Sequence, residues 1–247
     1  MGFLFVIFVF FVATNHPSSP SMKFILTNRN RINLPPGHCL LTFDDGPAGR
    51  VTDELLAVLR EFKVRACFCL IGSLVLNQSE RVKSIADDGH VLVNHTYHHR
   101  FANLLSLDRL EKDLALCDAA VAEAIGGPKV PLLWFRPPFG LVTESVRKVA
   151  KTRRILPITH FAFDTLFRTD RAVSAARSIV QDAKRHRGGI FVLHDGLFQS
   201  HVSGAESSSN RTWIPRAVRR ILEELSGCGF EFPEPTKILR EIVMRRI

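Results

Sequence analysis

Short apolar runs alternate with longer segments of helical periodicity from residue 38 onward. The apolar runs cover residues 39–43, 66–71, 91–93, 132–135, 155–163, 190–193 and 230–232. The helical pattern is clearest where apolar residues recur every three or four positions, at Ile214, Ala217, Val218, Ile221, Leu222 and Leu225. Repeated strand and helix units favour parallel strands joined by right-handed crossovers. The sequence therefore predicts an α/β fold, either a doubly wound sheet or a compact, incomplete barrel of about seven strands.

One domain accounts for most of the chain. Its 247 residues are 46% hydrophobic, which is sufficient for a single large core at residues 38–247. We expect an apolar leader at residues 1–21 and a linker at residues 22–37. The eleven apolar positions at 3–13 are too short to span a bilayer but match a signal peptide or an anchor, although no Lys or Arg precedes them. The protein is accordingly expected to be secreted or attached to the cell envelope or membrane, and cytoplasmic if translation starts at Met22.

Charge and cysteine content exclude two classes of protein. The chain has 33 Lys and Arg against 24 Asp and Glu, a formal net charge of +9, which favours acidic surroundings such as cell-wall polymer or anionic lipid. The basic residues are scattered and accompany no nucleic-acid-binding motif, so we expect no nucleic-acid partner. The five cysteines are widely spaced, and no disulfide framework is predicted. Cys67 and Cys69 are expected to share one buried face of a strand.

Titratable residues directly follow four of the predicted strands. Asp44 and Asp45 follow "CLLTF", His95 follows "VLVN", Arg136 follows "LLWF", and His194 and Asp195 follow "IFVL". In parallel barrels the carboxyl ends of the strands meet at one rim, and reactive groups lie there. The sequence thus predicts that these side chains gather in one site.

A metal site is predicted at this rim. His95 and His99 are four residues apart, so one helical turn would place both rings on the same side. An aspartate from a neighbouring strand end completes a set of two imidazoles and one carboxylate, with positions left for water and substrate. His98 is expected to point elsewhere. A cation also explains the adjacent aspartates, because one carboxylate can bind it while the other acts as a base on water.

Four motifs in this order resemble those of the polysaccharide deacetylase family, also called the NodB homology domain or carbohydrate esterase family 4. They are "TFDDG" at 42–46, "HTYHH" at 95–99, "RPPFG" at 136–140 and "FVLHD" at 191–195. The resemblance covers about residues 38 to 235, nearly the whole chain beyond the leader and linker. It implies a distorted (β/α) barrel that removes N-acetyl groups from N-acetylhexosamine glycans such as chitooligosaccharides or peptidoglycan, with release of acetate.

The resemblance also implies a catalytic role for each matching residue. Asp44 corresponds to the general base and His194 to the general acid. Arg136 corresponds to the residue that holds the base in place. The backbone N–H of Phe139 corresponds to a substrate-binding donor that stabilises the oxyanion.

The metal ligands implied by the resemblance are Asp45, His95 and His99. Zinc is the expected ion for two imidazoles and one carboxylate, with cobalt, nickel, manganese or iron as alternatives. Arg100, directly after the last ligand, stands where proline is common in the family.

The fourth family motif approximates D-x-x-D-W, and this chain departs from it. The corresponding run is "DTLFR", in which Asp164 fits but Phe167 and Arg168 replace the second aspartate and the aromatic residue. The usual partner of the histidine acid is therefore missing unless Asp170 substitutes for it. Two alternatives stay open. One is a non-catalytic carbohydrate-binding relative, and the other is a deacetylase whose substrate is either the ester O-acetyl xylan or a different amide.

Overall fold

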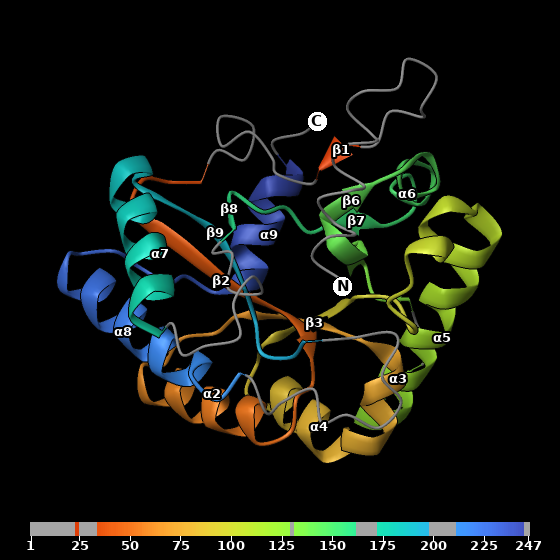
Figure 1. The fold of residues 1–247 in the computed structure, drawn as a ribbon, viewed down its shortest axis with the longest axis horizontal. Helices are drawn as coiled ribbons and strands as arrows, with labels where there is room; N and C mark the ends of the chain where they lie inside the picture. Colours follow the sequence, from red (N-terminus) through yellow and green to blue (C-terminus); the bar gives the residue numbers. More distant parts are fainter. Residues whose placement is uncertain (1–22, 25–33, 129–130, 162–171, 198–210, 245–247) are drawn as a thin grey trace.

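A curled parallel sheet forms the centre of the protein. The computed structural model describes residues 23–24, 34–128, 131–161, 172–197 and 211–244. The sheet contains β2 (His38–Gly46), β3 (Cys67–Leu70), β4 (Val91–Asn94), β5 (Trp134–Phe135), β7 (Arg154–Ile155), β8 (His160–Phe161) and β9 (Gly188–His194). All neighbours pair in parallel in the order β7-β5-β4-β3-β2-β9-β8 (Figure 1). The edge strands β7 and β8 do not pair with each other in the described chain, so the sheet forms a half-barrel, which confirms the predicted distorted barrel.

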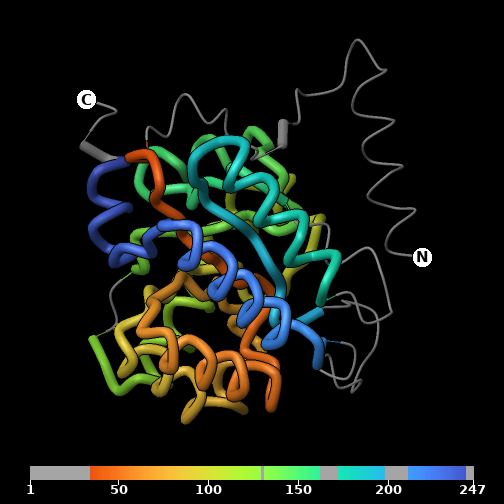
Figure 2. Tube along the Cα trace, turned by 90° about the vertical axis from the view of Figure 1, so that its left-hand side faces the viewer, coloured from red at the N-terminus to blue at the C-terminus, as the bar shows by residue number. Residues whose placement is uncertain are grey.

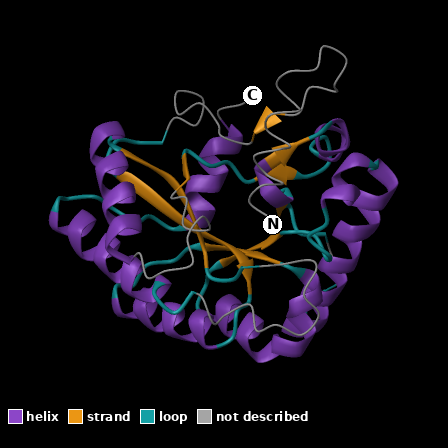
Figure 3. Ribbon diagram, in the orientation of Figure 1, coloured by secondary structure: helices purple, strands orange, loops and turns teal. Residues whose placement is uncertain are grey.

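Helices pack against the sheet, most of them on its outer side. They are α2 (Arg50–Glu61), α3 (Gly72–Val75), α4 (Ser79–Asp87), α5 (Leu107–Ile125), α6 (Glu144–Val149), α7 (Ala172–His186), α8 (Ile214–Gly227) and α9 (Pro235–Met244). Short 3-10 helices occur at η2 (Leu76–Gln78), η3 (Phe101–Leu105) and η4 (Pro138–Gly140). Most of the helices follow the convex face of the sheet (Figure 3), and α8 lies between α2 and α7 (Figure 2). In contrast, α9 packs against the inner face.

Alternation along β2 explains this two-sided packing. Successive side chains of a strand point to opposite faces. Leu41 and Phe43 pack outward with the surrounding helices, whereas Leu40 packs inward in a cluster that includes Ile238 and Leu239 of α9. Thr42 and Asp44 continue the inward series, so the same alternation that builds the core directs Asp44 into the barrel mouth.

The predicted stripe on α8 is confirmed. Its members are all buried: Ile214, Ala217, Val218, Ile221, Leu222 and Leu225. Pro215 lies in the first turn, where its missing N–H has no helical partner to lose. The stripe joins the outer core, which holds α8 in place beside β2 and β9.

Two predicted strands differ in the structure. The run at 230–232 is not a strand, because the described chain has only an isolated bridge between Glu231 and His38 there. Its neighbours explain the error, since Gly229 has a φ of +79° and Pro233 has no N–H to donate to a ladder. The run at 155–163 forms two short strands, β7 and β8, separated by Pro157; residues 162 and 163 lie outside the described residues.

All five cysteines are free, and Cys67 and Cys69 share one buried face of β3 as predicted, the inner one.

Within the predicted linker, β1 (Lys23–Phe24) pairs antiparallel with β6 (Leu141–Val142). The leader at residues 1–21 lies outside the described residues, and the domain boundaries stay predictions. Among the described helices, none is long and apolar enough to cross a membrane.

Candidate active site

The carboxyl ends of the strands bring the predicted residues together. Asp44 at the end of β2 is the register partner of His194 at the end of β9. Asn94 at the end of β4 is paired with Phe135 of β5, directly before Arg136. Parallel strands with nearly level ends therefore convert four distant sequence segments into one rim.

Three side chains converge on one point at this rim. Asp45 Oδ1 lies 3.3 Å from His95 Nε2 and 3.3 Å from His99 Nε2. The three candidate ligand atoms all lie within 4.8 Å of one another, and all three residues are buried. Within the described part of the chain, no other group of His, Cys, Asp and Glu side chains meets this criterion.

The protonation of this cluster fits a divalent cation. His95 Nδ1 lies 2.7 Å from the carbonyl oxygen of Arg136, so Nδ1 carries the proton and Nε2 presents its lone pair to Asp45. Burial lowers the pKa of His99 to about 4, which keeps this ring neutral. Burial alone would raise the pKa of Asp45, but the positive charge that His99 and the neighbouring histidines carry when protonated outweighs burial and holds the pKa below its usual range. Two imidazole nitrogens and one carboxylate are a typical donor set for a divalent transition metal.

Arg136 holds the second aspartate. Its Nη1 donates to Asp44 Oδ1 at 2.9 Å and to Thr42 Oγ1 at 2.8 Å. Its Nη2 donates to the carbonyl oxygen of Pro157 at 3.3 Å. The guanidinium group is 1% exposed, so it provides a buried positive charge that fixes and compensates the Asp44 carboxylate.

His194 and Phe139 lie near the cluster. The His194 side chain is buried, and its ring centroid lies 5.7 Å from that of Phe161. Phe139 adopts a φ of +61°, and its ring centroid lies 4.7 Å from that of His99. A non-glycine residue with positive φ is uncommon and often marks a functional site.

Comparison with known proteins identifies the family. The family model for polysaccharide deacetylases matches residues 31–155. A peptidoglycan-N-acetylglucosamine deacetylase of Bacillus cereus is 32% identical over 202 residues, which are 81% of this chain and 87% of the relative. The chain belongs to the polysaccharide deacetylase family.

Further relatives of this polysaccharide deacetylase agree in extent and fold. A chitooligosaccharide deacetylase of Bradyrhizobium sp. is 28% identical over 195 residues, 77% of this chain and 85% of the relative. The structure of a family 4 carbohydrate esterase from Streptomyces lividans in complex with acetate is 25% identical and superposes with a TM-score of 0.62. The match covers 78% of this chain and 90% of that one. The similarity therefore extends over most of the chain and not over a single motif.

The two candidate histidine ligands, His95 and His99, lie in a loop and not in a helical turn, so that expectation was wrong. Thr96 has a φ of +65° and His99 a φ of +49°, values that no right-handed helix contains. The Thr96 hydroxyl accepts a hydrogen bond from His99 N at 3.1 Å and closes the loop. His98 points elsewhere, as predicted, with its Nδ1 2.5 Å from Asp113 Oδ1.

Asp195 lies at the rim as predicted, and its carboxylate is fully buried next to Gly46, a position to which the sequence assigned no role. Asp195 Oδ2 accepts a hydrogen bond from Thr52 Oγ1 at 2.5 Å, and this hydroxyl accepts from Ala48 N at 2.8 Å. A Cβ added to Gly46 would lie 2.6 Å from both carboxylate oxygens. Burial and the nearby Asp45 raise the pKa of Asp195 to about 7. Its position directly after His194 was a signal, whereas Thr52 gave none.

The divergent fourth motif cannot be compared with its family counterpart. Asp164, Phe167 and Arg168 lie outside the described residues, as does the possible substitute Asp170. The partner that this motif would give His194 therefore stays a prediction.

Proposed function

We propose that this deacetylase hydrolyses the N-acetyl groups of N-acetylhexosamine residues in a glycan of the peptidoglycan or chitooligosaccharide type. The products are acetate and a free amine on the sugar. One observation carries the proposal: Asp45, His95 and His99 converge on one point, beside the register pair of Asp44 and His194. The names of the Bacillus cereus and Bradyrhizobium relatives support the substrate class.

Asp45, His95 and His99 would hold one divalent cation, with zinc the best fit to the donor set and cobalt, nickel, manganese or iron compatible with it. When bound, this cation supplies Lewis acidity, which polarises the acetyl carbonyl and acidifies a water molecule. The buried surroundings of the three side chains strengthen these electrostatic effects.

Asp44 is the proposed general base. Arg136 donates to its Oδ1, and the other carboxylate oxygen can accept the proton of the attacking water. Arg136 is itself held by Thr42 and Pro157, so the orientation of Asp44 is set before substrate arrives. Arg136 therefore acts as a positioning residue for the base.

Phe139 and His194 complete the proposed mechanism. The N–H of Phe139 donates to the developing oxyanion, which forms as water adds to the acetyl carbonyl. His194 then protonates the amide nitrogen as the carbon–nitrogen bond breaks, because an unprotonated amine anion is a poor leaving group. Imidazole suits this step because its usual pKa lies near neutrality.

The proposal includes a location. The apolar run at residues 3–13 and the excess of basic residues support secretion or attachment at the cell envelope, where an acidic polymer would be accessible. Fractionation of cells that express the full chain would test this. Recovery in the soluble cytoplasmic fraction alone would contradict it.

A metal and glycan survey tests the activity. The full chain is loaded with zinc, its metal content is measured, and acetate release is followed on chitooligosaccharides, peptidoglycan, O-acetyl xylan and a small acetamide. We expect release from the N-acetyl glycans. Bound metal without acetate release would indicate a carbohydrate-binding relative, and a preference for acetylated xylan would contradict the substrate class.

A further inference from the structure

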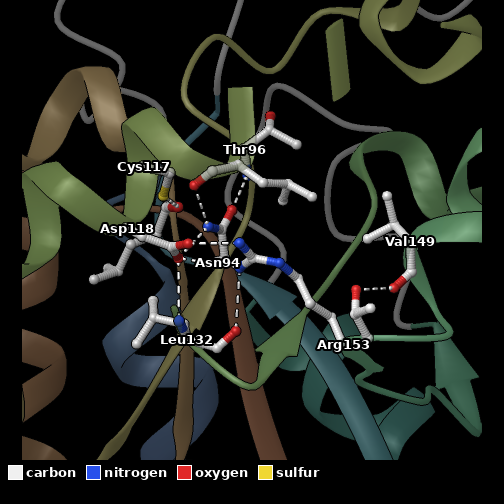
Figure 4. A network of polar contacts seen from close by, with 10 residues as sticks. Asn94, Thr96, Cys117, Asp118, Leu132, Val149 and Arg153 are labelled. Atoms are coloured by element: carbon white, nitrogen blue, oxygen red, sulfur yellow. Dashed lines mark hydrogen bonds and ion pairs between the residues drawn. The ribbon is translucent and has the colours of Figure 1, made fainter. Parts of the chain in front are cut away.

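The side chain of Asn94 links the cation site to a more distant ion pair. Asn94 is fully buried and directly precedes His95. Its Nδ2 donates to Leu114 O at 2.9 Å and to Asp118 Oδ1 at 2.7 Å, and its Oδ1 accepts from Thr96 N at 2.8 Å (Figure 4). A carboxylate only accepts hydrogen bonds, so Asp118 requires Nδ2 to face it. This fixes the amide orientation that leaves Oδ1 for Thr96.

Thr96 transmits this orientation to the cation ligands. Its φ of +65° is unfavourable for a β-branched residue, and such a conformation persists only when its surroundings impose it. The N–H of Thr96 donates to Asn94 Oδ1, and the hydroxyl of Thr96 accepts a hydrogen bond from His99 N. Thr96 lies between His95 and His99, so its conformation sets how the two rings approach each other.

Asp118 is held in turn by Arg153. Asp118 lies on α5, and Arg153 follows α6; their side chains are 10% and 14% exposed. Arg153 Nη2 donates to Asp118 Oδ2 at 2.6 Å, and Nη1 donates to Oδ1 at 3.2 Å and to Leu132 O at 3.2 Å (Figure 4). Leu132 N also donates to Asp118 Oδ1, at 3.2 Å. The carboxylate is thus compensated and has one orientation.

We propose that Asp118 and Arg153 are positioning residues for the cation site, which act through Asn94 and Thr96. The inference rests on the cation site of the proposed function but not on the identity of the glycan. Without the carboxylate, only the carbonyl oxygen of Leu114 still accepts from Asn94 Nδ2. The orientation of the Asn94 amide, and with it the acceptor for Thr96 N, is then held less firmly. The loop at residues 95–99, which carries the two candidate histidine ligands, then spends less time in the conformation that binds the cation.

The test is the cation affinity of the Asp118→Asn variant of the full chain. Zinc binding is measured by competition with a chromophoric chelator, without glycan. An amide at this position keeps the volume of Asp118 but must present an NH₂ group to either Asn94 or Arg153. We expect zinc binding to weaken about 10-fold to 100-fold, the range typical for groups that orient metal ligands. At saturating zinc, kcat should recover and KM for the glycan should match the wild type.

Variants of Arg153 separate positioning from general destabilisation. Arg153→Gln should weaken zinc binding. The double variant with Asp118→Asn should bind zinc no more weakly than whichever single variant has the lower zinc affinity, because the two residues act as a unit. Arg153→Lys keeps the charge but loses the paired donors, and it should restore part of the affinity lost in Arg153→Gln. Additive losses in the double variant would contradict the proposed coupling.

A second two-point ion pair, more exposed than that of Asp118 and Arg153, provides a control. Arg81 Nε and Nη2 donate to the two carboxylate oxygens of Asp53 at 2.6 and 2.8 Å, and neither side chain belongs to the hydrogen bonds around Asn94. Asp53→Asn should therefore leave zinc affinity unchanged. Wild-type zinc affinity in Asp118→Asn, whatever its melting temperature, would overturn the proposal.

Two further outcomes have defined meanings. If Asp118→Asn does not fold, Arg153→Lys and Arg153→Gln decide by the same measurement, since unchanged affinity in both would also overturn the proposal. If the wild type releases no acetate from any glycan but Asp118→Asn still weakens zinc affinity, the positioning role is supported and only the proposed function is rejected.

Discussion

The two ends of β4 carry the same residue type in opposite roles. His90 precedes the strand, and its Nδ1 accepts a hydrogen bond from Ala66 N at 3.1 Å. His95 follows the strand, and its Nδ1 faces the carbonyl oxygen of Arg136. The first arrangement places the ring proton on Nε2, whereas the second leaves a lone pair there. Both side chains are buried, so the partner of Nδ1, and not burial, distinguishes a structural histidine from a candidate ligand.

The contrast extends to the two ends of the whole sheet. At the amino end, charged groups form exposed pairs such as Arg65 with Glu234 at 2.6 Å. Such pairs contribute little to stability. At the carboxyl end, Asp44, Asp45 and Arg136 are buried in close proximity. Burying charged groups costs free energy, and such groups are typical of functional sites. The position of a charged group along the strands therefore predicts its role better than its residue type does.

The largest expected effect separates the two histidines of β4. His95→Ala should weaken zinc binding by more than about 100-fold, beyond the range for groups that only orient a ligand, and should abolish acetate release. His90→Gln should leave zinc affinity within about twofold, because His90 contacts no ligand. Zinc competition on both variants makes the measurement. Comparable losses would remove the distinction between the two ends.

The next effect separates the two aspartates of β2. Asp44→Asn should reduce kcat about 10²-fold to 10⁴-fold, the contribution typical of a general base, and should retain zinc. Asp45→Asn should lose zinc. Metal content and acetate release are measured on the same preparations. Equal loss of zinc in the two variants would reverse the assignment of base and ligand.

A smaller effect is expected from the acid, and it depends on the leaving group. His194→Ala should slow hydrolysis of an N-acetyl substrate about 10²-fold or more. Hydrolysis of an activated acetyl ester should slow less than about tenfold, because its leaving group departs without a proton. Parallel assays with the two substrates provide the ratio. An equal loss on both substrates would exclude His194 as the acid.

The last effect concerns stability at the amino end and leaves activity unchanged at neutral pH. Burial lowers the pKa of His90 from 6.5 to about 4, so the folded protein binds its proton less readily than the unfolded chain does. The free energy of unfolding should therefore be unaffected by His90 above pH 6.5 and should fall as the pH decreases from 6.5 to 4, by up to about 3 kcal/mol. Urea unfolding of wild type and His90→Gln across this range isolates the contribution. Parallel curves for the two proteins would contradict it.

Local sequence patterns were sufficient to predict the main sheet and the rim. Alternation and helical spacing depend on neighbours in the chain, and parallel strands place all their carboxyl ends together. Asp44, His95 and His194 could therefore be assigned to one site without coordinates. The stripe on α8 was predictable for the same reason.

Long-range contacts determine the features that the sequence did not reveal. The conformation of the loop at 95–99 depends on Asn94, which depends on Asp118 of α5, and no local pattern encodes this chain of contacts. Thr96 and His99 adopt positive φ without the glycine that usually signals it. The segment at 230–232 lacks a strand, and α9 packs on the inner face, because of tertiary packing that short apolar runs do not specify.

The central place of β2 also bears on how the protein is made. On one side β2 pairs with β3, which pairs in turn with β4, the strand that precedes His95 and His99, and on its other side it pairs with β9, which carries His194. A ribosome synthesises the first side well before the second. A nascent chain thus contains Asp45, His95 and His99 before His194 has been translated, so the candidate ion ligands are synthesised ahead of the proposed proton donor.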